Sequence, residues 1–100
     1  MDVFQVVADP TRRRLLDLLA EGEQPVQSLA THFSSTLQAV SQHLKTLQAA
    51  DLVRSRKDGR FRYYRVNPSG LREMDAWLER YRVFWNGRLA RLGRHLDEQP

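Results

Sequence analysis

A stretch near the middle of the chain, residues 36–50 (TLQAVSQHLKTLQAA), constrains the fold more than any other. Apolar side chains recur there every three or four residues, which predicts one buried stripe of an α-helix, formed by Leu37, Val40, Leu44 and Leu47. Thr36 is well placed to cap the start of this helix. The opposite face is polar and has no acidic residue; it carries Gln38, Gln42, Lys45, Thr46 and Ala49, with Ser41 and His43 on its flanks.

This polar face has the chemistry needed to read DNA bases. Glutamine, serine and histidine side chains can both donate and accept hydrogen bonds, as base edges in the major groove require. A face that met only water would usually carry more pairs of Glu and Lys four residues apart. An ordinary solvated helix face is the alternative, and this helix alone does not decide between the two.

The residues before this helix predict a helix-turn-helix over residues 26–50. A short helix is expected over residues 26–33, with Val26, Leu29, Ala30 and Phe33 on one side. The polar residues 34–36 (SST) then break it. A short helix, a tight turn and a second amphipathic helix form the helix-turn-helix arrangement, whose second helix enters the groove.

The residues after the helix predict a basic β-hairpin, or wing, over residues 52–66. Strands are expected over residues 52–57 and 60–66, because Asp58-Gly59 between them is a strong two-residue turn signal. Between residues 54 and 65, six of the seven charged side chains are basic. An exposed sheet edge protected by charge is the alternative, although acidic residues would serve that purpose equally well.

Positive charge is concentrated in the same region. Residues 36–66 contain seven basic and two acidic residues, a net charge of +5, whereas the whole chain has +4 and the remainder therefore −1. Local positive charge on an otherwise neutral domain is typical of a protein that binds a polyanion. Arginine outnumbers lysine, which favours planar contacts with phosphate or guanine, although a GC-rich genome would also enrich arginine.

The N-terminal part predicts an apolar segment followed by a helix. Residues 2–8 are largely apolar, and Asp9-Pro10 is a typical helix start. A helix is expected over residues 11–20, and its buried side is formed by Leu15, Leu16, Leu18 and Leu19. The run Arg12 to Arg14 is interpreted as a solvated or ion-paired face, with DNA phosphate contact as the alternative.

The C-terminal part predicts a long helix that one copy of the chain cannot bury. Residues 67–70 (NPSG) form a turn, and an apolar stripe then continues to about residue 96, a helix of about 40 Å. A domain of this size has a radius of gyration of only about 13 Å. We therefore expect a homodimer interface formed by Val3, Phe4, Val7, Leu78, Tyr81, Trp85, Leu89 and Leu92. A monomer whose tail frays after Gly87 is the alternative.

Several classes of protein are excluded or disfavoured. One hundred residues fit one domain, residues 1–100. The absence of cysteine excludes disulfides and thiolate chemistry. No stretch is apolar enough to span a membrane and no signal peptide is visible, so we expect a cytoplasmic protein with no membrane partner. Without a Gly-rich phosphate loop or paired catalytic residues, neither an enzyme nor a cofactor is expected.

Two segments together resemble the ArsR-type family of bacterial winged helix-turn-helix repressors. They read FQVVADPTRRRLLDLLAEGE and AVSQHLKTLQAADLVRSRKDGRFRYYRVNP, and the resemblance covers nearly the whole chain. It implies a mainly α fold with a small β-hairpin wing that dimerises through N- and C-terminal helices, residues 2–8 and 68–96. It also implies a cytoplasmic bacterial repressor that binds an operator on the nucleoid.

The resemblance also implies which residues contact DNA. Gln38, Ser41 and Gln42 are expected at or near the bases, with Thr36 and Lys45 near phosphates. His43 is expected either to read a base or to pack or cap. The wing residues Arg56, Lys57, Arg60 and Arg62 are expected at the flanking backbone or minor groove. Leu37 departs from the family pattern, because many relatives carry a polar residue there.

No metal site is expected. Many relatives sense metals through a Cys-x-Cys pair, but residues 24–29 (QPVQSL) contain no thiolate and no histidine. His95 and Glu98 have the spacing of only half of a second family site, while Arg82 and Phe84 stand about where the other half would be. An unknown small-molecule inducer near Trp77, Phe84 and Trp85 is an alternative to our interpretation of these aromatic residues as dimer core.

Two functions from different classes remain. The first is a sequence-specific regulator that represses transcription by binding a palindromic operator as a homodimer. The second is a winged-helix module that binds another protein through its aromatic C-terminal helix. The basic wing distinguishes them, because a protein-interaction module does not need it.

Overall fold

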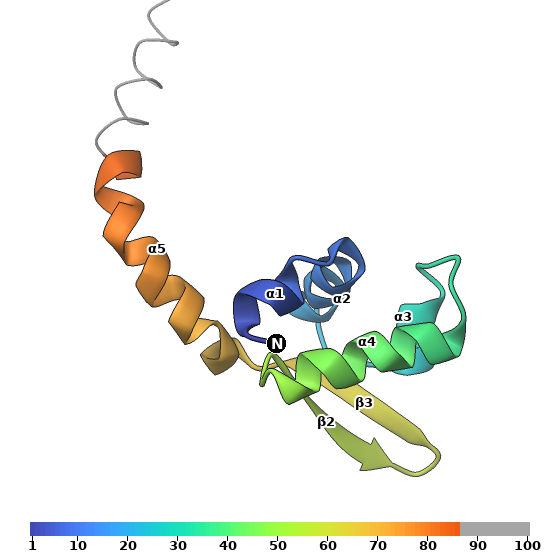
Figure 1. The fold of residues 1–100 in the computed structure, drawn as a ribbon. Coiled ribbons are helices and arrows are strands. Elements are labelled where there is room, and N and C mark those ends of the chain that lie inside the picture. Colours follow the sequence, from blue (N-terminus) through green and yellow to red (C-terminus); the bar gives the residue numbers. More distant parts are fainter. Residues whose placement is uncertain (87–100) are drawn as a thin grey trace, which may run out of the picture.

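A computed structural model describes residues 1–86 of the chain (Figure 1). The described elements are, in chain order, α1 (Val3–Val7), α2 (Pro10–Ala20), β1 (Gln24–Pro25), α3 (Val26–Ala30), α4 (Leu37–Ala49), β2 (Val53–Asp58), β3 (Phe61–Val66), the 3₁₀ helix η1 (Pro68–Leu71) and α5 (Arg72–Phe84). The expected mainly helical fold with a β-hairpin wing is confirmed. Among the described residues, no helix is long and apolar enough to span a bilayer.

The helix starts follow from side chains that cap free backbone amides. The Asp9 carboxylate accepts hydrogen bonds from the amides of Thr11 and Arg12 at 2.8 and 3.1 Å, and Pro10 occupies the first position of α2. The Thr36 hydroxyl accepts one from the amide of Ala39 at 3.1 Å. Both predicted caps are confirmed.

The N-terminal apolar segment is a helix held by the next one. Asp2 and Gln5 form a capping box, in which each backbone amide donates to the other side chain at 2.9 Å. At the other end of α1, the Arg13 guanidinium donates to the carbonyls of Val7 and Ala8 at 2.8 and 3.0 Å. This part of the arginine run therefore satisfies backbone carbonyls at the end of α1.

We expect Asp9→Ala to destabilise the protein by about 1 kcal/mol, the usual cost of a lost cap. Burial opposes ionisation of Asp9, but hydrogen bonds from the backbone amides of Arg12 and Thr11 and the charges of His43 and Arg12 outweigh it, so the pKa of Asp9 is lowered. The resulting stabilisation is complete above the unfolded pKa of about 3.9 and is lost as pH falls through the folded value. Urea denaturation between pH 3 and 7 measures it.

The matched control for this prediction is Asp9→Asn, because asparagine caps a helix nearly as well but does not titrate. The asparagine variant should be close to wild type at neutral pH and should lose less stability than wild type below about pH 4. Equal acid sensitivity of the two proteins would contradict the role assigned to the carboxylate.

The sheet has three antiparallel strands in the order β1-β3-β2. Strand β1 is only two residues long: Gln24 and Pro25 pair with Tyr64 and Tyr63 of β3. The proline is tolerated because β1 is an edge strand. Two residues are too short a pattern to predict a strand; only the distant β3 supplies the pairing.

The hairpin turn lies one residue later than expected. Asp58 pairs with Phe61, so Gly59 and Arg60 form the turn, and of these two only Gly59 has a positive φ, +64°. Because side chains alternate along a strand regardless of the turn, this shift does not change which residues share a face. One face of the hairpin carries Val53, Ser55, Lys57, Arg62, Tyr64 and Val66, and the other carries Arg54, Arg56, Asp58, Phe61, Tyr63 and Arg65.

The core lies between the helices and the first of these hairpin faces. Its fully buried members are Val6, Leu15, Leu29, Val40, Leu44, Leu47, Leu52 and Val53, and Tyr64 is nearly as buried. Leu16 was expected in the core but only packs against its edge. Leu37 was expected on the buried stripe of α4 but is 45% exposed. It is the first residue of α4, where the helix extends beyond the core.

The end of α4 is joined closely to the start of the C-terminal helices. Asp51 takes the left-handed conformation (φ +62°), and the amide of Leu52 donates to the carbonyl of Leu47 at 2.9 Å, which closes the helix. The buried Asn67 donates from its side-chain amide to the Asp51 carbonyl at 2.8 Å. Gly70 packs against that same carbonyl so closely that a Cβ would overlap it.

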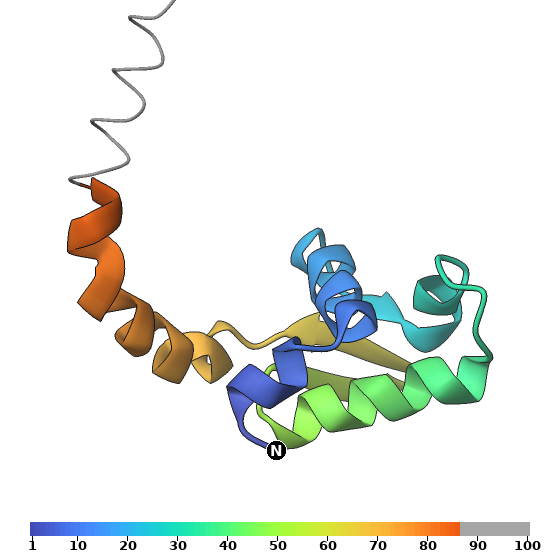
Figure 2. The same ribbon diagram turned by 45° about the horizontal axis from the view of Figure 1, so that its top comes forward.

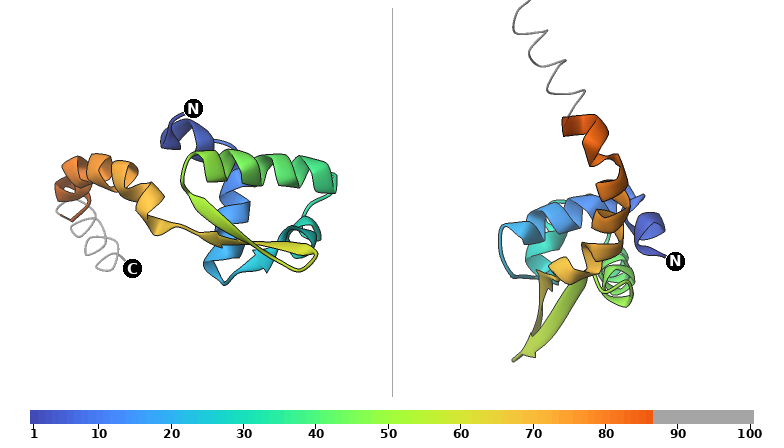
Figure 3. Two further views of the ribbon diagram at one scale, coloured as in Figure 1. Left: turned by 90° about the horizontal axis from the view of Figure 1, so that it is seen from below. Right: turned by 90° about the vertical axis from the view of Figure 1, so that its left-hand side faces the viewer.

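Helix α5 extends away from the rest of the domain, on the side opposite α3 (Figures 1, 2 and 3). None of its residues is buried, and its contact with the body runs through η1 and α1. The dimerisation helix was expected to continue to residue 96. Its predicted residues Leu89 and Leu92, with Leu96, lie outside the described residues.

Candidate nucleic-acid interface

Helices α3 and α4 are separated by residues 31–36 and form the helix-turn-helix. Helix α3 ends at Ala30, before the expected residue 33, and Phe33 is half-buried in the turn. On α4, the side chains of Gln38, Gln42 and Lys45 are exposed. No hydrogen bond or ion pair within residues 1–86 engages them, so their donors and acceptors are free for a ligand.

Two other predicted residues, the N-cap residue Thr36 and Ser41 on α4, are less available than these three. The hydroxyl of Thr36 is exposed at the N-terminus of α4 but already accepts the capping hydrogen bond from Ala39. Ser41 is half-buried beside the exposed row. Both side chains remain at the edge of the surface formed by Gln38, Gln42 and Lys45. We call these five residues the reading face of α4.

His43 lies apart from the reading face and turns toward α2. Its ring is half-buried, and its Nδ1 accepts a hydrogen bond from Arg12 Nε at 3.3 Å. Arg12 also donates to the carbonyl of Val6 at 3.3 Å. Of the roles considered for His43, packing is therefore the one that these contacts favour. The histidine links the second helix of the motif to α2 and, through Arg12, to α1.

The wing places its basic residues on two opposite faces. Lys57 and Arg62 pair across the strands on the face that packs against the helices, and Arg60 stands in the turn. Arg62 donates to the Ser55 hydroxyl at 3.0 Å, and that hydroxyl donates to Gln48 Oε1 on α4 at 3.3 Å. Lys57 and Arg62 therefore share the side of the hairpin that adjoins the second helix of the motif.

Arg56 is on the other face and already has partners. Its guanidinium forms an ion pair with Glu23 at 2.7 Å and with Asp58 at 3.3 Å, and it stacks over the Tyr63 ring, 4.9 Å from its centroid. The hydrogen bond from Arg56 lowers the pKa of Glu23. The structure thus separates Arg56 from the other predicted wing residues. Strand alternation alone could have shown this in the sequence, because 56 and 57 differ in parity.

The predicted dimer residues fall into two groups. Val3 is only 6% exposed and belongs to the protomer's own core. It is therefore unavailable to a partner, which differs from its predicted place in the dimer interface. Phe4 packs edge-on against Trp77, with ring centroids 5.6 Å apart, and Val7 and Leu78 are half-buried. Tyr81 and Trp85 are 43% and 46% exposed. An aromatic surface of this kind on one helix indicates a protein interface.

Residues 7–56 match the model of a helix-turn-helix domain family. The chain is also similar to the transcriptional repressor SdpR of Bacillus subtilis, with 35% identity over 77% of this chain and 86% of that protein.

Two solved structures of regulators share the fold. One is a crystal structure described as a possible transcriptional regulator for arsenical resistance, with 50% identity, a TM-score of 0.71, and coverage of 91% of this chain and 92% of that one. The other is the homodimeric winged helix-turn-helix DNA-binding domain of a possible ArsR-family regulator from Mycobacterium bovis. The two chains are 32% identical with a TM-score of 0.65, and the match covers 81% of this chain and 75% of the Mycobacterium bovis domain. The chain belongs to the ArsR-type family of winged helix-turn-helix regulators.

As an ArsR-type protein, the chain is a DNA-binding transcriptional regulator and not an enzyme. The relatives give no support to the alternative of a protein-interaction module.

This ArsR-type chain contains no cysteine. Among the described residues, no three His, Asp or Glu side chains gather in a group that could hold a metal. His95 and Glu98, which have the spacing of half a family metal site, lie outside the described residues. Arg82, where another ligand would stand, instead pairs with Asp75 and Glu79.

Proposed function

We propose that this ArsR-type regulator is a repressor that binds a palindromic operator as a homodimer, in the bacterial cytoplasm on the nucleoid. The observation that carries the proposal is the reading face of α4, whose glutamine and lysine side chains are exposed and free of partners. The repressor name of the Bacillus subtilis relative and the homodimeric state of the Mycobacterium bovis domain support it.

In this proposal α4 enters the major groove with its N-terminal half. Gln38 and Gln42, one helical turn apart, face the base edges, with Ser41 beside them. Thr36 and Lys45 contact phosphates at the two ends of the reading face, and Lys57, Arg60 and Arg62 contact the flanking backbone or minor groove. Two copies would contact half-sites about 34 Å apart, one turn of the double helix.

The dimer would form through α1 and α5. Phe4 and the exposed aromatic residues of α5 support this assignment. The small-molecule inducer stays a prediction. If one exists, an aromatic surface between two subunits would let it change the spacing of the two reading faces.

We expect Gln42→Ala to weaken binding to the operator by about 1–3 kcal/mol while changing binding to unrelated DNA little. The reason is that a glutamine amide pairs with one base edge, whereas phosphate contacts do not depend on sequence. The measurement is fluorescence anisotropy with the duplex upstream of the protein's own gene and with a scrambled duplex of equal composition.

Gln48→Ala is the matched control, because Gln48 lies on the same helix but its side chain contacts the wing residue Ser55. It should leave the ratio of the two affinities unchanged. If Gln42→Ala also left this ratio unchanged, the reading face would be wrongly assigned. If wild type bound neither duplex at low salt, the operator proposal itself would fail for this promoter.

A further inference from the structure

An exposed leucine stands at the start of the second helix of the motif. Leu37 is the first residue of α4 and is 45% exposed, whereas Val40 and Leu44, further along the same helix, are fully buried. Every other large apolar side chain of residues 26–49 is buried or half-buried. Leu37 is therefore the large apolar group that the helix-turn-helix presents to solvent.

The position of Leu37 on α4 explains its exposure. Helical residues three and four apart are neighbours, so Leu37 adjoins both the buried Val40 and Ser41 of the reading face. Side chains of a helix lean toward its N-terminus, and the first residue has no earlier turn to cover. Figures 1 and 2 show the start of α4 at the end of the domain away from α5, so α5 of the same protomer does not cover Leu37.

The neighbours of Leu37 in the chain are residues that the proposed function assigns to DNA. Thr36 precedes it at the N-terminus of α4, and Gln38 follows it with an exposed side chain. When α4 enters the major groove with its N-terminal half, Leu37 must enter with them. A leucine pressed against the polar edge of a base would leave a donor or acceptor without a partner, which is costly. Leu37 therefore needs an apolar partner in the groove.

The bases offer one apolar substituent in the major groove, the C5-methyl group of thymine. Contact between leucine and this methyl group removes apolar surface of both from water, which is favourable. We propose that Leu37 binds the methyl group of one thymine in each half-site of the operator and so selects thymine over cytosine at that position. This inference rests on the proposed function and adds a specificity-determining residue to it.

The contribution of Leu37 can be separated from that of the polar reading face. Uracil has the same hydrogen-bonding groups as thymine and also pairs with adenine, but it lacks the methyl group. Replacing thymine with uracil therefore leaves the hydrogen bonds available to Gln38 and Gln42 unchanged and removes only the apolar partner proposed for Leu37.

In the experiment, full-length wild type first selects an operator from a library of random duplexes. Each thymine of the half-site is then replaced with uracil in turn, in both half-sites together, and affinities are measured by fluorescence anisotropy. At one position uracil should weaken wild-type binding about tenfold, the effect of one lost methyl contact in each half-site. Leu37→Ala should bind the thymine duplex at least as weakly as wild type binds the uracil duplex, and should bind both duplexes alike.

Gln38→Ala is the matched control, because it truncates the next side chain and keeps the leucine. It should weaken binding but retain the difference between the thymine and uracil duplexes, and circular dichroism should show that both variants are folded. A wild type indifferent to uracil at every position, a selected half-site without thymine, or a Leu37→Ala protein that keeps the uracil effect would overturn the role of Leu37 and leave the proposed function standing. A library from which wild type enriches no sequence would overturn both.

Discussion

Replacing Gly70 with alanine is expected to lower the free energy of unfolding by about 3 kcal/mol or more. A Cβ at this position would overlap the Asp51 carbonyl oxygen and would lie 2.7 Å from its carbonyl carbon and 3.0 Å from Leu52 Cα. All of these atoms belong to backbone that is held in place, since Asn67 hydrogen-bonds both residues: its side chain donates to the Asp51 carbonyl and its backbone amide donates to the Leu52 carbonyl. Overpacking against such backbone cannot be relieved by rotating a side chain.

The measurement is urea denaturation followed by circular dichroism, at one fixed protomer concentration because dimerisation contributes to apparent stability. Gly59→Ala is the matched control. Its Cβ would meet nothing within 4 Å, but its φ of +64° should cost about 1–2 kcal/mol. A Gly70→Ala variant as stable as Gly59→Ala would contradict the close approach between Gly70 and Asp51.

This contact connects folding to function. It joins the C-terminal end of the helix that carries the reading face to the start of the C-terminal helices. A displacement at Gly70 would alter the angle between α4 and α5, and with it the spacing of two reading faces in a dimer. We therefore expect Gly70→Ala protein that is fully folded to bind its operator more weakly than wild type does. The loss of stability alone would not cause this difference, because only folded protein is compared.

The sequence predicted the elements whose signals are local. The stripe of Val40, Leu44 and Leu47 and the cap at Thr36 located α4 to within a residue at each end. Asp9-Pro10 located the start of α2 in the same way. These signals depend on neighbours within one helical turn, so they need no knowledge of the rest of the fold.

The features that the sequence did not reveal depend on distant partners. β1 exists because β3 pairs with it, and Asp51 is held in a left-handed conformation that is unusual for a residue other than glycine. The turn shifted by one residue because Asp58 could serve either as a turn residue or as a strand end. The close approach of Gly70 to Asp51 joins segments nearly twenty residues apart, and no local sequence pattern indicates it.

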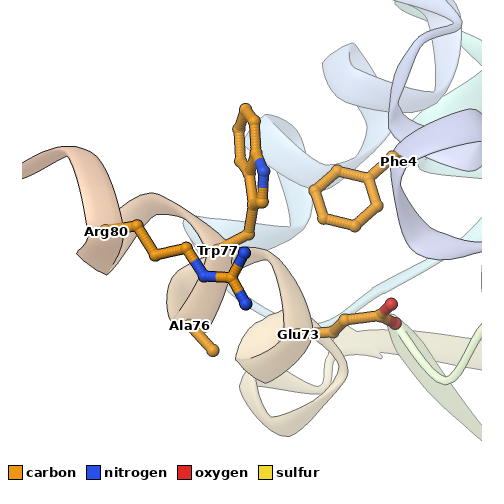
Figure 4. A pocket seen from close by; sticks show the side chains of 5 residues that line it. All are labelled: Phe4, Glu73, Ala76, Trp77 and Arg80. Carbon is orange, nitrogen blue, oxygen red and sulfur yellow. The ribbon is translucent and has the colours of Figure 1, made fainter.

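The candidate site was predicted as a list of residues but not as an arrangement. Gln38, Gln42 and Lys45 are exposed on α4 as expected, whereas the partners of His43 and Arg56 became apparent only from the fold. On α5, the sequence drew attention to large apolar residues. Glu73, Ala76 and Arg80, which line a pocket with Phe4 and Trp77 (Figure 4), were not singled out, although their spacing places them with Trp77 on one helical face.

Removing the three basic residues of the proposed DNA-binding side of the wing should have the largest effect on DNA binding. The triple variant Lys57→Ala/Arg60→Ala/Arg62→Ala removes six positive charges from a dimer. If each neutralises one phosphate, the slope of log Kobs against log salt should become shallower by about five, and affinity near 0.1 M salt should fall about 10³–10⁵-fold. Binding to operator and to scrambled DNA should fall alike, because phosphate contacts carry no sequence information.

The opposite face of the same hairpin supplies the control. Arg54→Ala/Arg56→Ala/Arg65→Ala removes the same number of positive charges, but these residues point away from the side shared with α4, and Arg56 is neutralised by Glu23. Anisotropy titrations at several salt concentrations should give a slope changed by no more than about one for this variant. Equal losses in the two triple variants would mean that net charge alone governs binding and that the wing has no DNA-facing side. A loss of DNA affinity only in the variant of Lys57, Arg60 and Arg62 would show that strand alternation in the wing places these positive charges on the side that contacts the DNA backbone.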